Sequence, residues 1–401
     1  MMFRMLFLLQ WLVLLVNPKL MLHLDNNAGN IVQKLLIILS GAAFVLARPM
    51  QRGVVLLIAA IVAVTLFCAV GTDYPGFQWR LYAGGVVSIV APFILLAAQP
   101  EDKDRSLALF LFAMLPPLAV ALGGLYQLVG IAPLFSSDPL SGTRLSGTQG
   151  PAYLAAACFT GTFAALELAE RRHLAYVSLL LIDVVLLVLA GGRMALAMAV
   201  LICGFDYLRS FRRTPLLKIF VPVWLLTCGG IALAMFGEDN LRHLQSTSLS
   251  NRDLIWAALV RHLHAHPWFG VGLGNQQLLI SASLTGKVST FASHNEFLRI
   301  AVELGYPGAA LFFAITLGIF FLVWNSAWVR RDRIFLVCVL AFYLYGLFDN
   351  TFSVPQIYFI LTAASFACRP RGEPASDLMA PQEARRSAAA KVAQPSSPRS
   401  V

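Results

Sequence analysis

Residues 53–70 read GVVLLIAAIVAVTLFCAV and contain no charged side chain. Because a helix crosses the roughly 30 Å hydrocarbon core of a bilayer with about 20 apolar residues, this stretch predicts a transmembrane helix. The whole chain has the same character: of 401 residues, 58% are hydrophobic and 12% are charged, against about 25% charged in soluble domains. These few charges cannot cover so much apolar surface in water, which excludes soluble enzymes and secreted scaffolds. The sequence therefore predicts an all-α integral membrane protein.

About twelve apolar runs are candidate transmembrane helices. They cover approximately residues 5–22, 31–46, 53–70, 81–98, 106–130, 151–169, 174–190, 193–208, 217–236, 300–328, 334–348 and 351–367. One large loop, at about 237–293, is the only segment between them with room for short helices of its own. We expect a polytopic membrane domain over residues 1–368. Residues 369–401 are rich in Pro, Ala, Ser and Arg, which predicts a disordered basic tail.

The positive charges predict how the chain is oriented in the membrane. A net charge of +10 suits a nucleic-acid binder, but the charges lie in short loops between apolar runs, so we expect no nucleic-acid partner. Five basic clusters are each separated from the next by two candidate spans. They are Arg48 with Arg52, Lys103 with Arg105, Arg171 with Arg172, Arg209 with Arg212, Arg213 and Lys218, and Arg330 with Arg331 and Arg333. The positive-inside rule assigns this side, with both termini, to the cytoplasm.

Several arginines fall on the opposite face, against this orientation bias. Arg193 follows two glycines between two apolar runs, so we expect it in a tight turn at the membrane edge. Charge at such a depth is costly unless it is paired or faces a polar cavity, and a guanidinium matches phosphate oxygens bidentately. Arg144 lies in a loop rich in glycine and hydroxyl groups before a helix start, where anions are favoured. Both arginines are predicted to converge on one diphosphate; the alternative is pairing with carboxylates or lipid phosphates.

The large loop ends in Ser293-His294-Asn295-Glu296. Ser293 and Glu296 have the spacing of a capping box, which predicts a helix that dips into the membrane with His294 in its first turn. Imidazole is the side chain best suited to proton transfer near neutral pH. Two interpretations stay open: a general base, and an interfacial histidine that only hydrogen-bonds the loop.

Other polar residues in or near the membrane have structural explanations. Arg299 and Glu303 are four residues apart, which predicts an ion pair within one helix. His262 and His266 share a helical face, but no carboxylate or cysteine completes a tetrahedral set, so we predict no metal site. Asp183, alone in an apolar run, is expected to be a protonated or paired structural residue, with a proton relay as the alternative.

In their order along the chain, these motifs resemble the O-antigen ligase/polymerase superfamily of bacterial inner-membrane glycosyltransferases. The residues that carry the resemblance are Arg252 and Trp256; His266, Pro267, Gly270 and Gly272; Ser293, His294, Asn295 and Leu298; and Glu303, Gly305 and Gly308. The similarity is strongest over about 250–310, and the twelve-span layout with a late loop extends it. In one respect the chain departs from the family, because Gln149 stands near Pro151 where an asparagine is usual.

The resemblance implies an undecaprenyl-diphosphate-linked glycan as donor, without cofactor or metal. The ligase branch transfers this glycan, with inversion, onto lipid A–core at the periplasmic face; a polymerase that joins lipid-linked repeat units is the alternative. A lipid-linked glycan transporter is more distant, because few polar residues mark a path through the membrane. We expect His294 to be the general base and Arg144, Arg193 and, more weakly, Arg252 to bind the diphosphate. The expected supporting residues are Gln149, His266, Asn295, Glu296 and Glu303.

Overall fold

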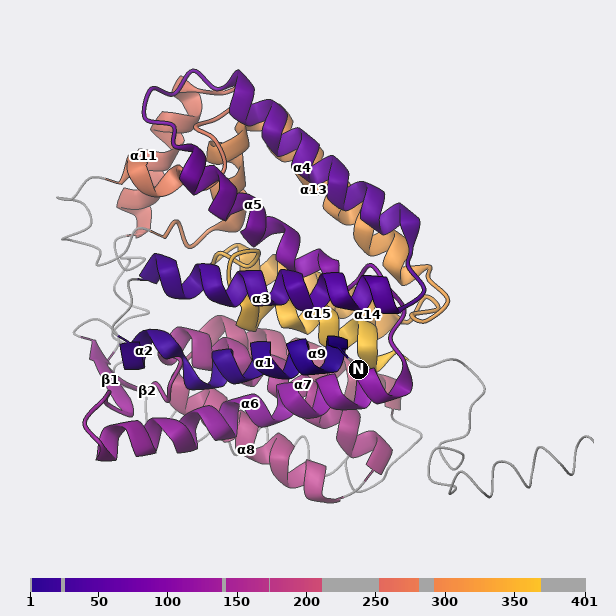
Figure 1. Cartoon of the computed structure of the whole chain (residues 1–401). Coiled ribbons are helices and arrows are strands. Elements are labelled where there is room, and N and C mark those ends of the chain that lie inside the picture. The colour runs from indigo at the N-terminus through magenta and orange to yellow at the C-terminus, as the bar shows by residue number, and fades with distance from the viewer. Residues whose placement is uncertain are drawn as a thin grey trace, which may run out of the picture. The chain divides into compact units, whose positions relative to one another are not determined.

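The computed structural model describes residues 2–22, 26–138, 142–172, 174–210, 252–280 and 292–368, and these residues are mostly helical (Figure 1). The helices of the apolar runs are α1 (Met2–Val16), α2 (Pro18–Leu22), α3 (Asn26–Ala47), α4 (Arg52–Gly71), α5 (Trp79–Ile94), α6 (Asp102–Leu128), α7 (Pro151–Arg172), α8 (Leu174–Ala190), α9 (Arg193–Ser210), α13 (Glu296–Trp324), α14 (Arg333–Gly346) and α15 (Pro355–Ala367). Every predicted run coincides with a helix except 217–236, which lies outside the described residues, as does the predicted tail 369–401.

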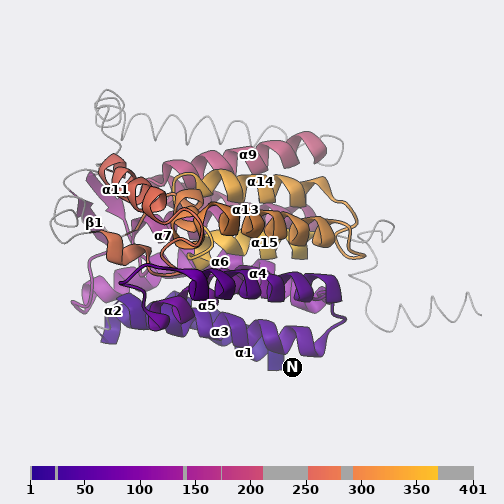
Figure 2. The same cartoon turned by 90° about the horizontal axis from the view of Figure 1, so that it is seen from above.

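Four helices in the described ranges are both long and apolar enough to cross a membrane: α4, α6, α7 and α13. Most of the others are shorter apolar helices that pack against them. Figure 2 shows that the axes of α3, α4, α13 and α14 lie roughly along one direction, whichever way each chain runs. The fold is therefore that of a helical membrane protein.

The ends of several helices meet in an ion-pair network, which we call the basic end of the bundle. Asp104, at the start of α6, accepts from Arg4 at 2.7 Å and from Arg48 at 2.8 Å. Arg105 donates to the carbonyl of Cys368, just after α15. Gln51, before α4, donates to a carbonyl in the last turn of α13 at 2.9 Å. These contacts bring basic clusters from separate parts of the chain to one end, as the charge pattern predicts.

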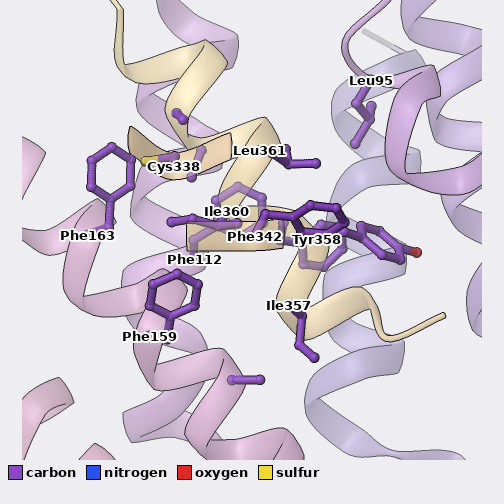
Figure 3. Close-up of a cluster of buried hydrophobic side chains, with 14 of the residues drawn as sticks. Leu95, Phe112, Phe159, Phe163, Cys338, Phe342, Ile357, Tyr358, Ile360 and Leu361 are labelled. Carbon is purple, nitrogen blue, oxygen red and sulfur yellow. The ribbon is translucent and has the colours of Figure 1, made fainter. Parts of the chain in front are cut away.

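The core is aromatic and centres on α15, whose residues are all buried. Figure 3 shows α15 side chains among Phe112 of α6, Phe159 and Phe163 of α7 and Phe342 of α14. The Phe112 ring lies 5.0 Å from that of Phe359. Because α15 has no exposed face, it forms the middle of the bundle.

The large loop contains helix α11 (Arg252–Ala265) and the short 3₁₀-helix η1 (Gln276–Leu279), as expected for that segment. The all-α prediction misses one element. Strands β1 (Phe135–Asp138) and β2 (Gly142–Leu145) form an antiparallel hairpin within the predicted loop at 131–150. Two strands of four residues leave little room for the alternating apolar pattern that marks a strand in sequence, which explains the omission.

Helix α13 is broken at Gly305, whose φ of 71° and ψ of 174° are not helical. The residues after α11 pack into this break. Tyr306 N donates to Pro267 O at 2.8 Å, and Gly272 N donates to Glu303 O at 2.9 Å. A Cβ on Gly305 would lie 2.5 Å from the carbonyl carbon of Trp268, so only glycine fits here. The break thus fixes the large loop to α13, which begins two residues after His294.

Candidate active site

His294 lies just before α13 and not in its first turn, which corrects the prediction from the capping-box spacing. The N-cap is Asn295, whose side chain accepts from a first-turn N–H at 2.9 Å. Ser293 instead donates to Asn350 Oδ1 at 2.7 Å, and its carbonyl accepts from the indole of Trp256 at 2.7 Å. Ser293 and Asn295 thus hold His294 from both sides in the left-handed region, at φ 48°. Strained positions of this kind cluster at functional sites.

Asp349 is the carboxylate beside His294, and the sequence analysis missed it. Its Oδ1 lies 3.5 Å from His294 Nδ1, an ion-pair distance slightly longer than an ordinary hydrogen bond. Asp349 lies in the turn between α14 and α15, next to the Asn350 that binds Ser293. The same argument that singled out Arg193, a charge in a short turn between two apolar runs, applies to Asp349 and identifies it.

Arg252 begins α11 and faces the same turn. Its Nη1 donates to the carbonyl of Phe348 at 3.2 Å. Burial lowers the pKa of Arg252 from the usual guanidinium value, while the negative charge of Asp349 opposes this shift. Since arginine stays protonated in proteins, Arg252 brings a positive charge to the turn that carries Asp349.

Arg144, on β2, packs against the α8–α9 turn, which Arg193 follows directly. Arg144 Nε donates to the carbonyl of Ala190, the last residue of α8, at 2.9 Å. A Cβ on Gly191, where φ is 64°, would lie 3.1 Å from the same nitrogen. Arg193 follows two residues later as the first residue of α9, and it is exposed. The tight turn expected before Arg193 is present, and Arg144 packs against it.

Tyr345 and Tyr153 lie near these charges. Tyr345 is buried on α14, close to both Asp349 and Arg144. Tyr153, in the first turn of α7, is close to Asp349. The α14–α15 turn and Arg144 therefore lie in one neighbourhood, at the end of α14 opposite its basic start.

Gln149, expected to support the site, is bound to the end of α1. Its amide nitrogen donates to the carbonyl of Leu14, and its Oε1 accepts from Gln356 at 2.8 Å. Thr148 Oγ1 donates to the carbonyl of Leu15 at 2.7 Å. The last carbonyls of a helix have no partner within the helix, and in a membrane they need one from the protein. Gln149 and Thr148 supply it, which gives this loop a structural task.

His266 pairs with Asp73, in the segment between α4 and α5. His266 Nδ1 lies 2.6 Å from Asp73 Oδ1, and this hydrogen bond lowers the pKa of Asp73. Burial lowers the pKa of His262. In the described part of the chain, no three His, Cys, Asp or Glu side chains converge as metal ligands do. The structure thus places His266 in a contact that joins the large loop to the α4–α5 connection.

The predicted pair of Arg299 with Glu303 is confirmed, at 2.8 Å, and it belongs to a larger cluster. Arg299 also donates to Glu296, one turn earlier, and all three side chains are buried. Glu303 accepts backbone N–H groups from Gly274 and Gln276 in the large loop. Glu296 and Glu303 therefore hold the start of α13 together and bind it to the large loop, and their support of the site stays a prediction.

A comparison with protein families matches residues 177–313 to the O-antigen ligase family. The matched segment contains Arg193, Arg252, His266, His294 and the first part of α13, with its buried ion pairs and its break at Gly305. A comparison with curated proteins finds no match. Because the matched residues include the motifs that carry the resemblance, the resemblance to the O-antigen ligase superfamily is confirmed over residues 177–313.

Proposed function

We propose that the protein is an O-antigen ligase that transfers an undecaprenyl-diphosphate-linked glycan onto lipid A–core. The observation that carries the proposal is the convergence of His294 and Arg252 on the turn that contains Asp349, with Arg144 in the same neighbourhood near Tyr345. A histidine beside a carboxylate supplies a proton acceptor, and arginines supply the charge that a diphosphate needs. This arrangement lies within or beside the segment that matches the ligase family.

The orientation follows from the basic end. By the positive-inside rule, the ion-pair network around Asp104 and the chain termini belong to the cytoplasm of a bacterial inner membrane. The α14–α15 turn and His294 lie at the other ends of their helices, so the reaction takes place on the periplasmic face. There the polyprenyl chain of the donor stays in the bilayer while its diphosphate reaches the arginines.

In this reaction the chain orients a base, accepts a proton and stabilises the leaving group. Asp349, beside Nδ1, orients the imidazole of His294, which leaves Nε2 to take the proton from the acceptor hydroxyl. The acceptor oxygen then attacks the anomeric carbon from the side opposite the diphosphate, and the carbon–oxygen bond to the diphosphate breaks, with inversion. Arg144, Arg193 and Arg252 stabilise the charge that grows on the departing diphosphate, so the reaction requires no metal ion.

Purified protein should transfer glycan from the lipid-linked donor to lipid A–core in the absence of nucleotide, and excess chelator should not change the rate. The reason is that the donor is already activated and that arginines take the place of a metal at its diphosphate. The products are measured by gel electrophoresis with a labelled donor. Chelator-sensitive activity that a divalent ion restores contradicts the metal-free mechanism. If the donor lengthens by itself and lipid A–core stays unmodified, the protein is a polymerase; no product from either substrate favours a transporter.

Replacing Arg193 with lysine should weaken donor binding and slow transfer together, because lysine keeps the charge but loses the two-pronged fit to phosphate. A hydrogen bond to a charged group contributes about 1.5–3 kcal/mol, so we expect a loss of about 10- to 100-fold. Donor binding and single-turnover transfer are measured on the same preparation. The matched control is Arg80→Lys, another exposed arginine at a helix start. If both variants bind and transfer normally, Arg193 is not a diphosphate ligand.

A further inference from the structure

Residues 266–272, which we call the corner, follow α11 and are held rigidly against two helices. Besides the bonds to the break of α13, Thr72 Oγ1 donates to Gly270 O at 2.7 Å. His266 binds Asp73, and the ring of Phe269 packs against the backbone of Gly71 at the end of α4. The corner is therefore a fixed platform, so the direction in which its side chains point is set by the fold.

This rigid corner displays a tryptophan outward. Trp268 is 70% exposed, although the backbone on both sides of it is bonded into the break of α13. Tyr306, just after the break, is 50% exposed, and Phe67 on α4 is 69% exposed. The Phe67 ring meets Phe269 edge to face at 5.7 Å. Aromatic side chains from three separate segments thus form one exposed surface, which we call the aromatic surface.

The aromatic surface lies where the exposed side of α4 changes from apolar to charged. Leu66, Phe67 and Val70 are exposed and apolar, whereas Asp73, beyond the end of the helix, is exposed and bound to His266. Helix α4 has 20 residues, about 30 Å at 1.5 Å per residue, which is close to the thickness of the hydrocarbon core. Since α4 begins at the basic end, its last turn reaches the opposite boundary of that core.

We propose that Trp268, Tyr306 and Phe67 form a lipid anchor that holds the large loop at the boundary between acyl chains and headgroups. Tryptophan and tyrosine prefer this boundary, because the ring is apolar while the N–H or O–H reaches water and headgroups. The occupant is lipid because the aromatic surface continues the exposed apolar side of α4, a candidate membrane span. The anchor sets the level of the α13 break, and with it the level of His294, which lies just before the start of α13. It does not depend on the proposed reaction.

The test uses the whole chain in bilayers and measures the depth of Trp268 by fluorescence quenching. The emission of Trp268 is obtained by subtracting the emission of Trp268→Phe from that of the parent protein. This exchange removes few contacts, because the side chain is so exposed. We expect most of this emission to be lost in lipids brominated near the headgroup, less to be lost in lipids brominated near the chain end, and little to be lost with iodide in the water. The control is Trp11, which is buried and bonded to Leu111 O; the emission lost in Trp11→Phe should respond weakly to all three quenchers.

Any other pattern of quenching contradicts the anchor. Quenching by iodide alone places the corner in water, where the aromatic surface would suit a soluble partner. Strongest quenching by bromines near the chain end places it inside the hydrocarbon core, and no quenching by any agent means that another protein surface covers it. A second variant, Tyr306→Trp made in the Trp268→Phe protein, puts an indole elsewhere on the same surface and should show the same depth profile. If the parent protein shows this depth profile but transfers no glycan, the proposed function fails and the anchor stands.

Discussion

Replacing His294 with alanine should leave donor binding nearly intact and slow glycan transfer by about 10²–10⁴-fold, the usual contribution of a general base. The methyl group of alanine cannot accept the acceptor's proton, whereas the arginines that bind the diphosphate are untouched. Asp349, 3.5 Å from Nδ1, loses its imidazole partner but keeps Arg252 as a neighbouring charge. Donor binding at equilibrium and single-turnover transfer, measured separately, distinguish the two effects.

The matched control for this prediction is His264→Ala, because His264 is an exposed histidine of the same large loop, on α11. It should transfer glycan at the parent rate. A correctly folded His294→Ala protein with near-parent transfer would show that His294 only hydrogen-bonds the loop, the interpretation that the sequence left open. An equal loss of binding and transfer would instead mean that His294 holds the donor.

The helices of this protein are predictable from sequence because each depends on a local property. A run such as 53–70 is apolar on every face, so it forms a helix in lipid whatever its neighbours are, and α4 covers that run. The basic clusters are also local signals, and the structure gathers Arg48 and Arg105 at one end. The break of α13 at Gly305 was not predicted, because it depends on the backbone of the corner packing into it.

The candidate site was predictable only in part, because its residues meet through tertiary contacts. The order of Arg144 and Arg193 at the ends of consecutive units predicts that they converge, and in the structure Arg144 binds the carbonyl of Ala190, three residues before Arg193. His294 was found as well, but its place before the helix was not, since Asn295 and Ser293 both have side chains suited to an N-cap. Only the fold decides between them, by giving Ser293 a partner in Asn350. The same turn brings Asp349 to His294 from 55 residues further along the chain.

Replacing Arg299 with methionine should destabilise the protein by about 3–5 kcal/mol, the usual cost of removing one partner from a buried ion pair. Arg299 lies between Glu296 and Glu303, and the three side chains are 5%, 1% and 1% exposed. Methionine fills much of the space of the arginine stem, so the main effect is the charge: two carboxylates remain buried with no guanidinium between them. Because Glu303 also accepts N–H groups from the large loop, the loop should loosen from α13 as the helix start loses its support.

Chemical or thermal unfolding in detergent measures this loss, with Arg330→Met as the control. Arg330 is exposed at the opposite end of α13, and exposed sites usually change stability by less than about 0.5 kcal/mol. Adding Glu296→Gln and Glu303→Gln to Arg299→Met removes both buried charges and should restore much of the stability, because a neutral set no longer needs a counter-charge. An Arg299→Met protein as stable as its parent would mean that water already solvates the carboxylates. If the triple variant stays as unstable as Arg299→Met, lost packing and not charge is the cause, and the start of α13 is held by the shape of the arginine.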